Sequence, residues 1–109
     1  MQNYLKNKIV LVKYPFTDYI ANKIRQAVII SKSIYNDMFI VPLTSRTDYL
    51  GVDEFILNDW KKAGLNVETA VKRGIFTIDS QLILKEIGYL SSKDSEKLKS
   101  SLISWLNLY

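Results

Sequence analysis

The side chains best suited to chemistry in this sequence form three polar clusters at the ends of apolar runs. The apolar runs cover residues 9–12, 27–30 and 39–43, and the clusters cover residues 14–18, 23–25 and 44–46. A protein core selects against such clusters, because a buried polar group costs free energy unless it is hydrogen-bonded. We therefore expect any chemistry at these strand ends.

Two residue types that serve many catalytic and metal sites are missing. The 109 residues include no histidine and no cysteine. This excludes histidine-based zinc sites, Ser-His-Asp triads, thiolate metal ligands and nucleophiles, and disulfides. Acid–base chemistry must then use carboxylates, Lys, Tyr or Arg, or a hydroxyl of the substrate. We expect neither a metal nor a cofactor.

The charge of the chain is basic, with a formal net charge of +4 and a pI near 9.3. This excess favours a polyanionic partner such as nucleic acid, although it also serves solubility alone. The length predicts a single domain over residues 1–109. No apolar run approaches the ~20 residues of a membrane span, and residues 1–6 lack the apolar stretch of a signal peptide. We expect a cytoplasmic protein.

The elements that would position the polar clusters are mostly short strands. β-Branched and apolar runs predict strands at 8–14, 26–31, 38–43, 53–57, 69–78 and 84–90. Residues 17–23 and 44–51 read as polar connections, 58–64 as a turn or one helical turn, and 80–83 as a short helix or a turn. Gly74 should interrupt the fifth run with a bulge or a bend.

The C-terminus is the one clear helix in the sequence. Ser91 or Ser92 can cap its first turn, where Asp94 favours the positive end of the helix dipole. One apolar stripe follows at helical spacing, formed by Leu98, Leu102, Trp105, Leu106 and Tyr109. Short strands with turn signals and one terminal helix predict a mainly β (α+β) domain, built as a small, strongly bent antiparallel sheet or barrel.

A series of short blocks extends over almost the whole chain: Ile9-Val10-Leu11-Val12, Tyr14-Pro15-Phe16-Thr17-Asp18, Lys23-x-Arg25-x-Ala27-x-Ile29-Ile30, Val41-Pro42-Leu43-Thr44-Ser45, Gly64-Leu65, Thr77-Ile78-Asp79 and Ile87-Gly88-Tyr89-Leu90-Ser91. Taken in order, these blocks resemble the MazF/PemK family of toxin endoribonucleases from bacterial toxin–antitoxin systems. Their shared order and spacing are more specific than any single block.

The resemblance implies an SH3-like, strongly bent antiparallel barrel with a C-terminal helix (the MazF/PemK/CcdB-type fold), assembled as a homodimer. It also implies metal-independent cleavage of single-stranded RNA at short sequence motifs, and inhibition by a cognate antitoxin. The catalytic arginine of the family falls on Arg25, and its catalytic threonine falls on Thr44.

This chemistry needs none of the missing residue types, because the ribose 2′-OH of RNA is itself the nucleophile. The general base stays open among three carboxylates, Asp18, Glu68 and Asp79, and Asp79 can equally cap a turn. The residues expected to contact RNA are Lys13, Tyr14, Phe16, Thr17, Lys23, Ser45, Arg46, Tyr49, Lys72 and Arg73. Aromatic side chains among them can stack on bases or pack in the barrel, and the basic ones can equally be surface charge.

Three residues depart from the family pattern. Gln26 stands where proline usually follows the arginine, Phe76 replaces a common arginine, and Arg73 stands where some members carry an acidic residue. These departures leave two alternatives open. One is a non-catalytic protein of the same fold that acts by binding, as the gyrase-directed CcdB group does, and the other is a basic SH3-like interaction module.

Overall fold

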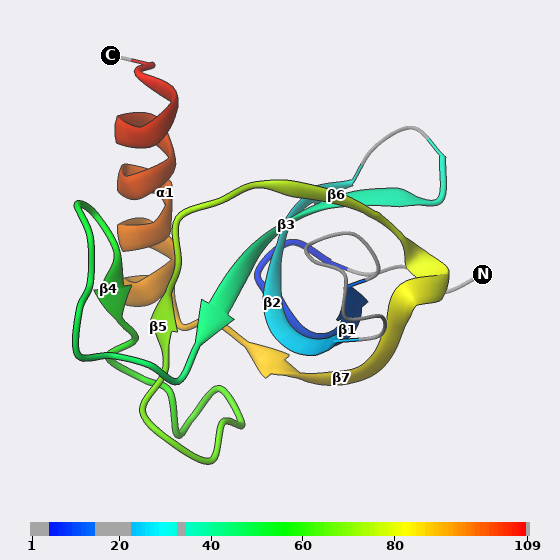
Figure 1. Ribbon diagram of the computed structural model, residues 1–109, viewed down its shortest axis with the longest axis horizontal. Coiled ribbons are helices and arrows are strands. Elements are labelled where there is room, and N and C mark those ends of the chain that lie inside the picture. The colour runs from blue at the N-terminus through cyan, green and yellow to red at the C-terminus, as the bar shows by residue number, and fades with distance from the viewer. Residues whose placement is uncertain (1–4, 15–22, 33–34, 109) are drawn as a thin grey trace.

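The computed structural model of the protein describes residues 5–14, 23–32 and 35–108 (Figure 1). Its strands are β1 (Lys8–Tyr14), β2 (Lys23–Lys32), β3 (Asp37–Thr44), β4 (Phe55–Ile56), β5 (Ala70–Val71), β6 (Phe76–Asp79) and β7 (Ile83–Tyr89). A 3₁₀ turn, η1 (Ser80–Leu82), precedes β7, and the helix α1 (Ser92–Leu106) follows it.

The strands form one antiparallel sheet in the order β4-β5-β3-β2-β1-β7, and β6 pairs with the first half of β3. Register shifts interrupt the β1–β7 ladder and the β2–β3 ladder, and such irregularities increase local bending. The sheet curls strongly around its own inner face (Figure 1). The predicted fold class is therefore confirmed, although within the described residues β4 and β7 remain two ends of an open path rather than closing a barrel.

The two faces of the sheet pack into two separate core clusters. On one face, Val28, Val41 and Leu98 belong to a cluster that lies between the sheet and α1. On the other face, Val12, Ala27 and Ile40 belong to a cluster enclosed by the curl of the sheet with β6 and η1. Because both faces are covered, the central strands are apolar in succession, as the run 9–12 predicted.

Helix α1 begins where the sequence indicated. Ser91 is its N-cap, and its Oγ accepts a hydrogen bond from the backbone N–H of Asp94 at 3.1 Å. The Asp94 carboxylate is buried and accepts the backbone N–H groups of Asn58 and Asp59, which fixes the turn after β4 to the start of the helix. The apolar stripe packs through Leu102 and Trp105, whereas Leu106 is half exposed and Tyr109 lies outside the described residues.

Two strand predictions needed correction. Strand β2 begins at Lys23, three residues before the predicted start, because residues 23–26 pair with β1. The strand predicted over 53–57 shrinks to two residues, since Asp53 adopts a φ of 63° within a tight turn. The predicted interruption at Gly74 is confirmed, as this residue has a φ of 153° and separates β5 from β6.

A close backbone contact holds the turn after β4 against β7. A Cβ atom placed on Gly88 would lie 2.0 Å from the carbonyl oxygen of Ala63. This contact brings Ala63 and Leu65 into the cluster beneath α1. Only glycine allows the two backbones to approach so closely.

Candidate functional site

Strand pairing brings Arg25 and Thr44 to corresponding positions on β2 and β3. The ladder between these strands pairs Ala27 with Pro42 and Val28 with Val41. The ladder ends at Ala27 and Pro42, and its register continued by two residues would bring Arg25 opposite Thr44. Because side chains two residues apart share a face of a strand, both continue the face of the buried Ala27.

This shared face changes from core to surface at the two residues. Ala27 and the cross-strand neighbour of Arg25, Val12, are fully buried, whereas Arg25 is exposed and Thr44 is half-buried. A cation and a hydroxyl therefore stand side by side at the rim of an apolar surface. The correction to the start of β2 matters here, because it places Arg25 inside a paired strand rather than in a loop.

The polar atoms of these two residues keep bonding capacity for a ligand. Within the described residues, the Arg25 guanidinium makes a single hydrogen bond, from Nη1 to the carbonyl oxygen of Ile24 at 3.4 Å. The Thr44 Oγ1 accepts the backbone N–H of Arg46 at 3.1 Å. A hydroxyl that accepts in this way still has its proton to donate, so Thr44 is oriented and remains a donor.

Glu68 lies in the connection that leads into β5, the strand that pairs with Thr44. Thr44 pairs with Ala70 of β5, and Glu68 is two residues before Ala70. The Thr47 hydroxyl donates to Glu68 Oε1 at 3.3 Å. The segment after β3 and the segment before β5 therefore stay adjacent beyond the ladder. Among the predicted bases in the described residues, Glu68 is the one that the sheet register brings near Arg25 and Thr44.

The other predicted bases are not brought to this rim. Asp79 pairs with Asp37, at the opposite end of β3 from Thr44. Its Oδ1 accepts the backbone N–H of Gln81 at 2.8 Å and caps η1, which is the turn-capping role that the sequence left open. Asp18 lies outside the described residues.

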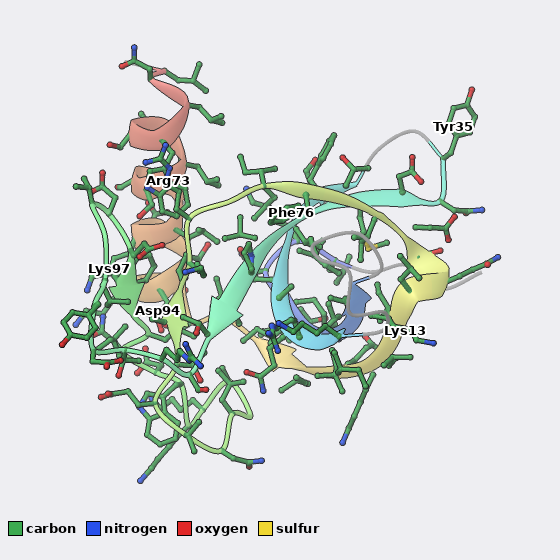
Figure 2. The ribbon with its side chains drawn as sticks, viewed as in Figure 1. Lys13, Tyr35, Arg73, Phe76, Asp94 and Lys97 are labelled. Carbon is green, nitrogen blue, oxygen red and sulfur yellow. The ribbon has the colours of Figure 1, made fainter. Side chains whose placement is uncertain are left out.

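The residues predicted to contact RNA are spread over several elements. Lys23 shares the face of Arg25 two residues away, and Ser45, Arg46 and Tyr49 lie exposed on the connection after β3. Tyr49 is 93% exposed. Lys13 follows Val12 and therefore takes the opposite face of β1. In Figure 2, Lys13 and Arg73 lie on opposite sides of the molecule. The backbone of Tyr14 ends β1, its side chain is not described, and Phe16 and Thr17 lie outside the described residues.

Two further basic residues stand just past β5. The backbone N–H of Lys72 donates to the carbonyl oxygen of Pro42 at 2.9 Å, which places Lys72 opposite Pro42, two pairs along from Thr44. Arg73 follows it on the side of α1, and both side chains are exposed. Arg25, Arg46 and Lys72 thus give this edge of the sheet the positive charge that a polyanionic ligand requires.

The sequence reading missed Glu54. Its Oε1 accepts the backbone N–H of Gly51 at 2.6 Å, and its Oε2 accepts the backbone N–H of Arg73 at 2.7 Å. Partial burial raises the pKa of Glu54, but the two backbone hydrogen bonds and the charges of Lys72 and Arg73 outweigh it, so the pKa lies below its usual value. Gly51 three residues before the acid is the only local signal, and it is weak.

Neither a metal centre nor a membrane segment is visible in the part of the chain that the structure describes. No three His, Cys, Asp or Glu side chains in those residues gather in a way that could hold a metal ion. None of the described helices is long and apolar enough to cross a membrane.

The fold is that of solved toxin structures. An endoribonuclease in complex with its cognate antitoxin from a mycobacterial species superimposes with a TM-score of 0.79 at 15% identity, covering 98% of both chains. The Mycobacterium tuberculosis toxin MazF-mt6 gives a TM-score of 0.73 at 18% identity, covering 92% of this chain and 96% of the toxin. A further mycobacterial endoribonuclease gives 0.75 at 16% identity, covering 98% of this chain and 94% of that chain.

A comparison of the sequence with family models shows the family. The family model described as PemK-like, MazF-like toxin of type II toxin-antitoxin system matches residues 6–106. The protein therefore belongs to this family of toxins. A comparison with curated protein sequences found no match.

Proposed function

We propose that the protein is an endoribonuclease that cleaves single-stranded RNA at short sequence motifs without a metal ion, and that a cognate antitoxin inhibits it. The observation that carries the proposal is the shared register of Arg25 and Thr44 at the open rim of the sheet. Membership of the toxin family supports the biological role. An RNA substrate implies action in the cytoplasm.

The reaction begins with the ribose 2′-OH next to the scissile phosphate. Its oxygen forms a bond to phosphorus, and the bond from phosphorus to the 5′-oxygen breaks, which leaves a 2′,3′-cyclic phosphate and a 5′-OH. The protein must hold the two oxygens in line and stabilise the charge that develops on the phosphoryl oxygens. It must also assist one proton's departure from the 2′-OH and one proton's arrival at the 5′-oxygen.

Arg25 and Thr44 suit the stabilisation of charge. A guanidinium is always protonated and presents paired donors that match two phosphate oxygens. The Thr44 hydroxyl, oriented by the Arg46 N–H, donates to a non-bridging oxygen or positions the 2′-OH. The apolar surface behind them, formed by Val12 and Ala27, excludes water from one side and strengthens both interactions.

Glu68 is our choice of general base, and water protonates the leaving 5′-oxygen. The support is its position two residues before Ala70, the partner of Thr44, and its contact with Thr47. The exposed Tyr49 and the basic residues Arg46 and Lys72 extend the site along the RNA. Aromatic faces stack on unpaired bases, and cations neutralise phosphates.

We also propose a homodimer as the working form. The support is the number of large apolar side chains left open on the single chain, including the half-exposed Ile24 of β2 and Leu84 of β7. An acidic antitoxin segment would find complementary charge on a chain with a net charge of +4. The mycobacterial structure with its antitoxin supports the same kind of partnership.

The decisive experiment treats a mixed-sequence RNA with purified protein in EDTA and maps the ends of the fragments. We expect cuts at a short recurrent motif, cyclic phosphate ends, and no cleavage of an oligonucleotide with 2′-deoxyribose at the cut position. Intact RNA under these conditions would contradict the proposal. Growth inhibition that persists in Arg25→Ala and Thr44→Ala proteins with intact RNA would point instead to a binding toxin.

A further inference from the structure

Glu54 joins two segments that flank the proposed site. Its two carboxylate oxygens accept the backbone N–H groups of Gly51 and Arg73, at 2.6 and 2.7 Å. Gly51 ends the connection that leaves β3 at Thr44, and Arg73 follows β5. One side chain therefore closes the connection after Thr44 against the basic segment Lys72–Arg73.

The sheet register places this contact two residue pairs from the row that contains Thr44. Phe55 pairs with Val71, and Ile56 pairs with Ala70, the partner of Thr44. One position earlier in that register, Glu54 stands opposite Lys72. The Lys72 N–H is already bonded to the carbonyl oxygen of Pro42, so Glu54, Lys72 and Pro42 form a row. This row lies two positions from that of Thr44 and therefore on the same face of the sheet.

The turn that carries Glu54 is itself anchored to α1. The Trp105 Nε1 donates to the carbonyl oxygen of Val52 at 3.0 Å, and the Ser101 Oγ donates to that of Asp53 at 2.7 Å. The Glu54 N–H also donates to the carbonyl oxygen of Gly51 at 3.1 Å. Helix α1 thus anchors the turn that carries Glu54, and the Glu54 carboxylate can hold the backbone of Arg73 in place.

The backbone at Arg73, which the Glu54 carboxylate holds, has little other support. Strand β5 ends at Val71, and the φ of 153° at Gly74 turns the chain away from regular pairing. Figure 2 shows Arg73 beside α1 and β5, with its side chain exposed. Without the carboxylate, the Arg73 N–H would lose its partner and the basic segment would gain freedom.

The geometry points to Glu54 as a positioning residue that presents Lys72 to RNA on the face of Thr44, by holding the backbone N–H of Arg73. This inference rests on the proposed function. Glu54 is unsuited to be the general base, because both of its oxygens already accept hydrogen bonds from the protein. The loss of a fixed cation weakens the binding of substrate and transition state alike, which raises KM and leaves kcat little changed.

The test compares Glu54→Ala and Glu54→Gln with the wild-type protein, and uses Glu96→Gln on the exposed surface of α1 as the matched control. We expect Glu54→Ala to raise KM for RNA roughly tenfold, the loss that one charge-assisted hydrogen bond represents, with kcat within about threefold. Glu54→Gln keeps one acceptor oxygen, so its KM should lie between those of the wild type and Glu54→Ala. Glu96→Gln should match wild type.

A binding measurement separates this inference from the proposed function. An RNA with 2′-deoxyribose at the cut position cannot be cleaved, so its Kd reports binding alone, and the Glu54 variants should weaken it in proportion to KM. Unchanged Kd and KM in a folded Glu54→Gln protein would overturn the inference. Equal losses of kcat in both variants with unchanged KM would do so too, by making Glu54 a base. Failure of the wild type to cleave any RNA would instead reject the proposed function.

Discussion

The two ends of β3 carry opposite kinds of polar surface. At its last residue, Thr44 accepts the backbone N–H of Arg46, and Arg25 and Lys72 lie on the neighbouring segments of the same open rim. At its first residue, Asp37 pairs with Asp79, whose carboxylate caps η1, and Ser80 donates to the carbonyl oxygen of Asn36. The eight residues of the strand separate these ends by roughly 23 Å at about 3.3 Å per residue.

The difference shows what distinguishes a site from a turn in this fold. At the Asp37 end, the polar atoms named above satisfy backbone groups of the protein. At the Thr44 end, the Thr44 hydroxyl keeps its proton and the Arg25 guanidinium keeps most of its donors within the described residues. Chemistry on an external phosphate requires the second arrangement, because a donor engaged internally must break a bond before it can serve a ligand.

Removal of the cation at the Thr44 end should have the largest effect. We expect Arg25→Ala to lower kcat by about 10³-fold, since one lost donor to the developing charge is worth ~2.7–4 kcal/mol. The melting temperature should stay near that of wild type, because the Arg25 side chain is exposed. RNA cleavage rates and thermal unfolding followed by circular dichroism measure the two quantities.

Lys85→Ala is the matched control, as Lys85 is an exposed cation inside β7. It should cleave as the wild type does. A folded Arg25→Ala protein that cuts RNA at the wild-type rate would remove the basis for treating the Thr44 end as the site.

The carboxylate beside the rim should matter next. Glu68→Gln keeps the shape of the side chain and removes its ability to accept a proton, so we expect kcat to fall by about 10²-fold, within the usual range for a general base. Steady-state cleavage of a short RNA would measure it. Asp48→Asn is the control, because Asp48 is an exposed acid on the connection between β3 and β4. An equal loss in both variants would indicate a general charge effect instead.

The strand pattern and the order of motifs were enough to predict the fold class, the capped C-terminal helix and the break at Gly74. Pairing could not be predicted, because it depends on register between segments far apart in the chain. The sequence therefore placed Arg25 in a polar cluster just before the second strand, whereas pairing with Val12 places it within that strand. For the same reason it could not separate Glu68 from Asp79, which differ in which end of β3 they reach.

Glu54 was invisible for another reason. Its role depends on two backbone N–H groups, one of them 19 residues away at Arg73. Backbone donors carry no signature in the sequence, and a single acid three residues after a glycine is most often a surface residue. Such contacts emerge only from the fold.

The Asp37 end should respond to mutation through stability rather than activity. Asp79→Ala removes the acceptor of the Gln81 N–H, and the loss of such a cap costs about 1 kcal/mol of unfolding free energy. Urea titration would measure this loss, while kcat for RNA cleavage should stay within twofold. A loss of cleavage comparable to that of Glu68→Gln, with stability unchanged, would make the two ends of β3 equivalent and defeat the comparison.

The smallest effect should appear as a pH dependence of stability at the Thr44 end. Despite partial burial, hydrogen bonds from Arg73 and Gly51 lower the pKa of Glu54 below its ordinary value of 4.5 in the folded protein. A lowered folded-state pKa stabilises the protein above the unfolded pKa, and this contribution disappears as the pH falls through the folded-state value. The difference in unfolding free energy between wild type and Glu54→Gln should be constant from pH 7 to about pH 5 and shrink below about pH 4.5.

Because Glu54 is partly exposed, solvent screening should keep this difference under about 1 kcal/mol. Urea titrations at several pH values would detect it, with Glu96→Gln as the control. A difference that grew on acidification would mean that the Glu54 carboxylate is destabilised in the fold, and its grip on Arg73 could not be what holds the basic segment beside Thr44.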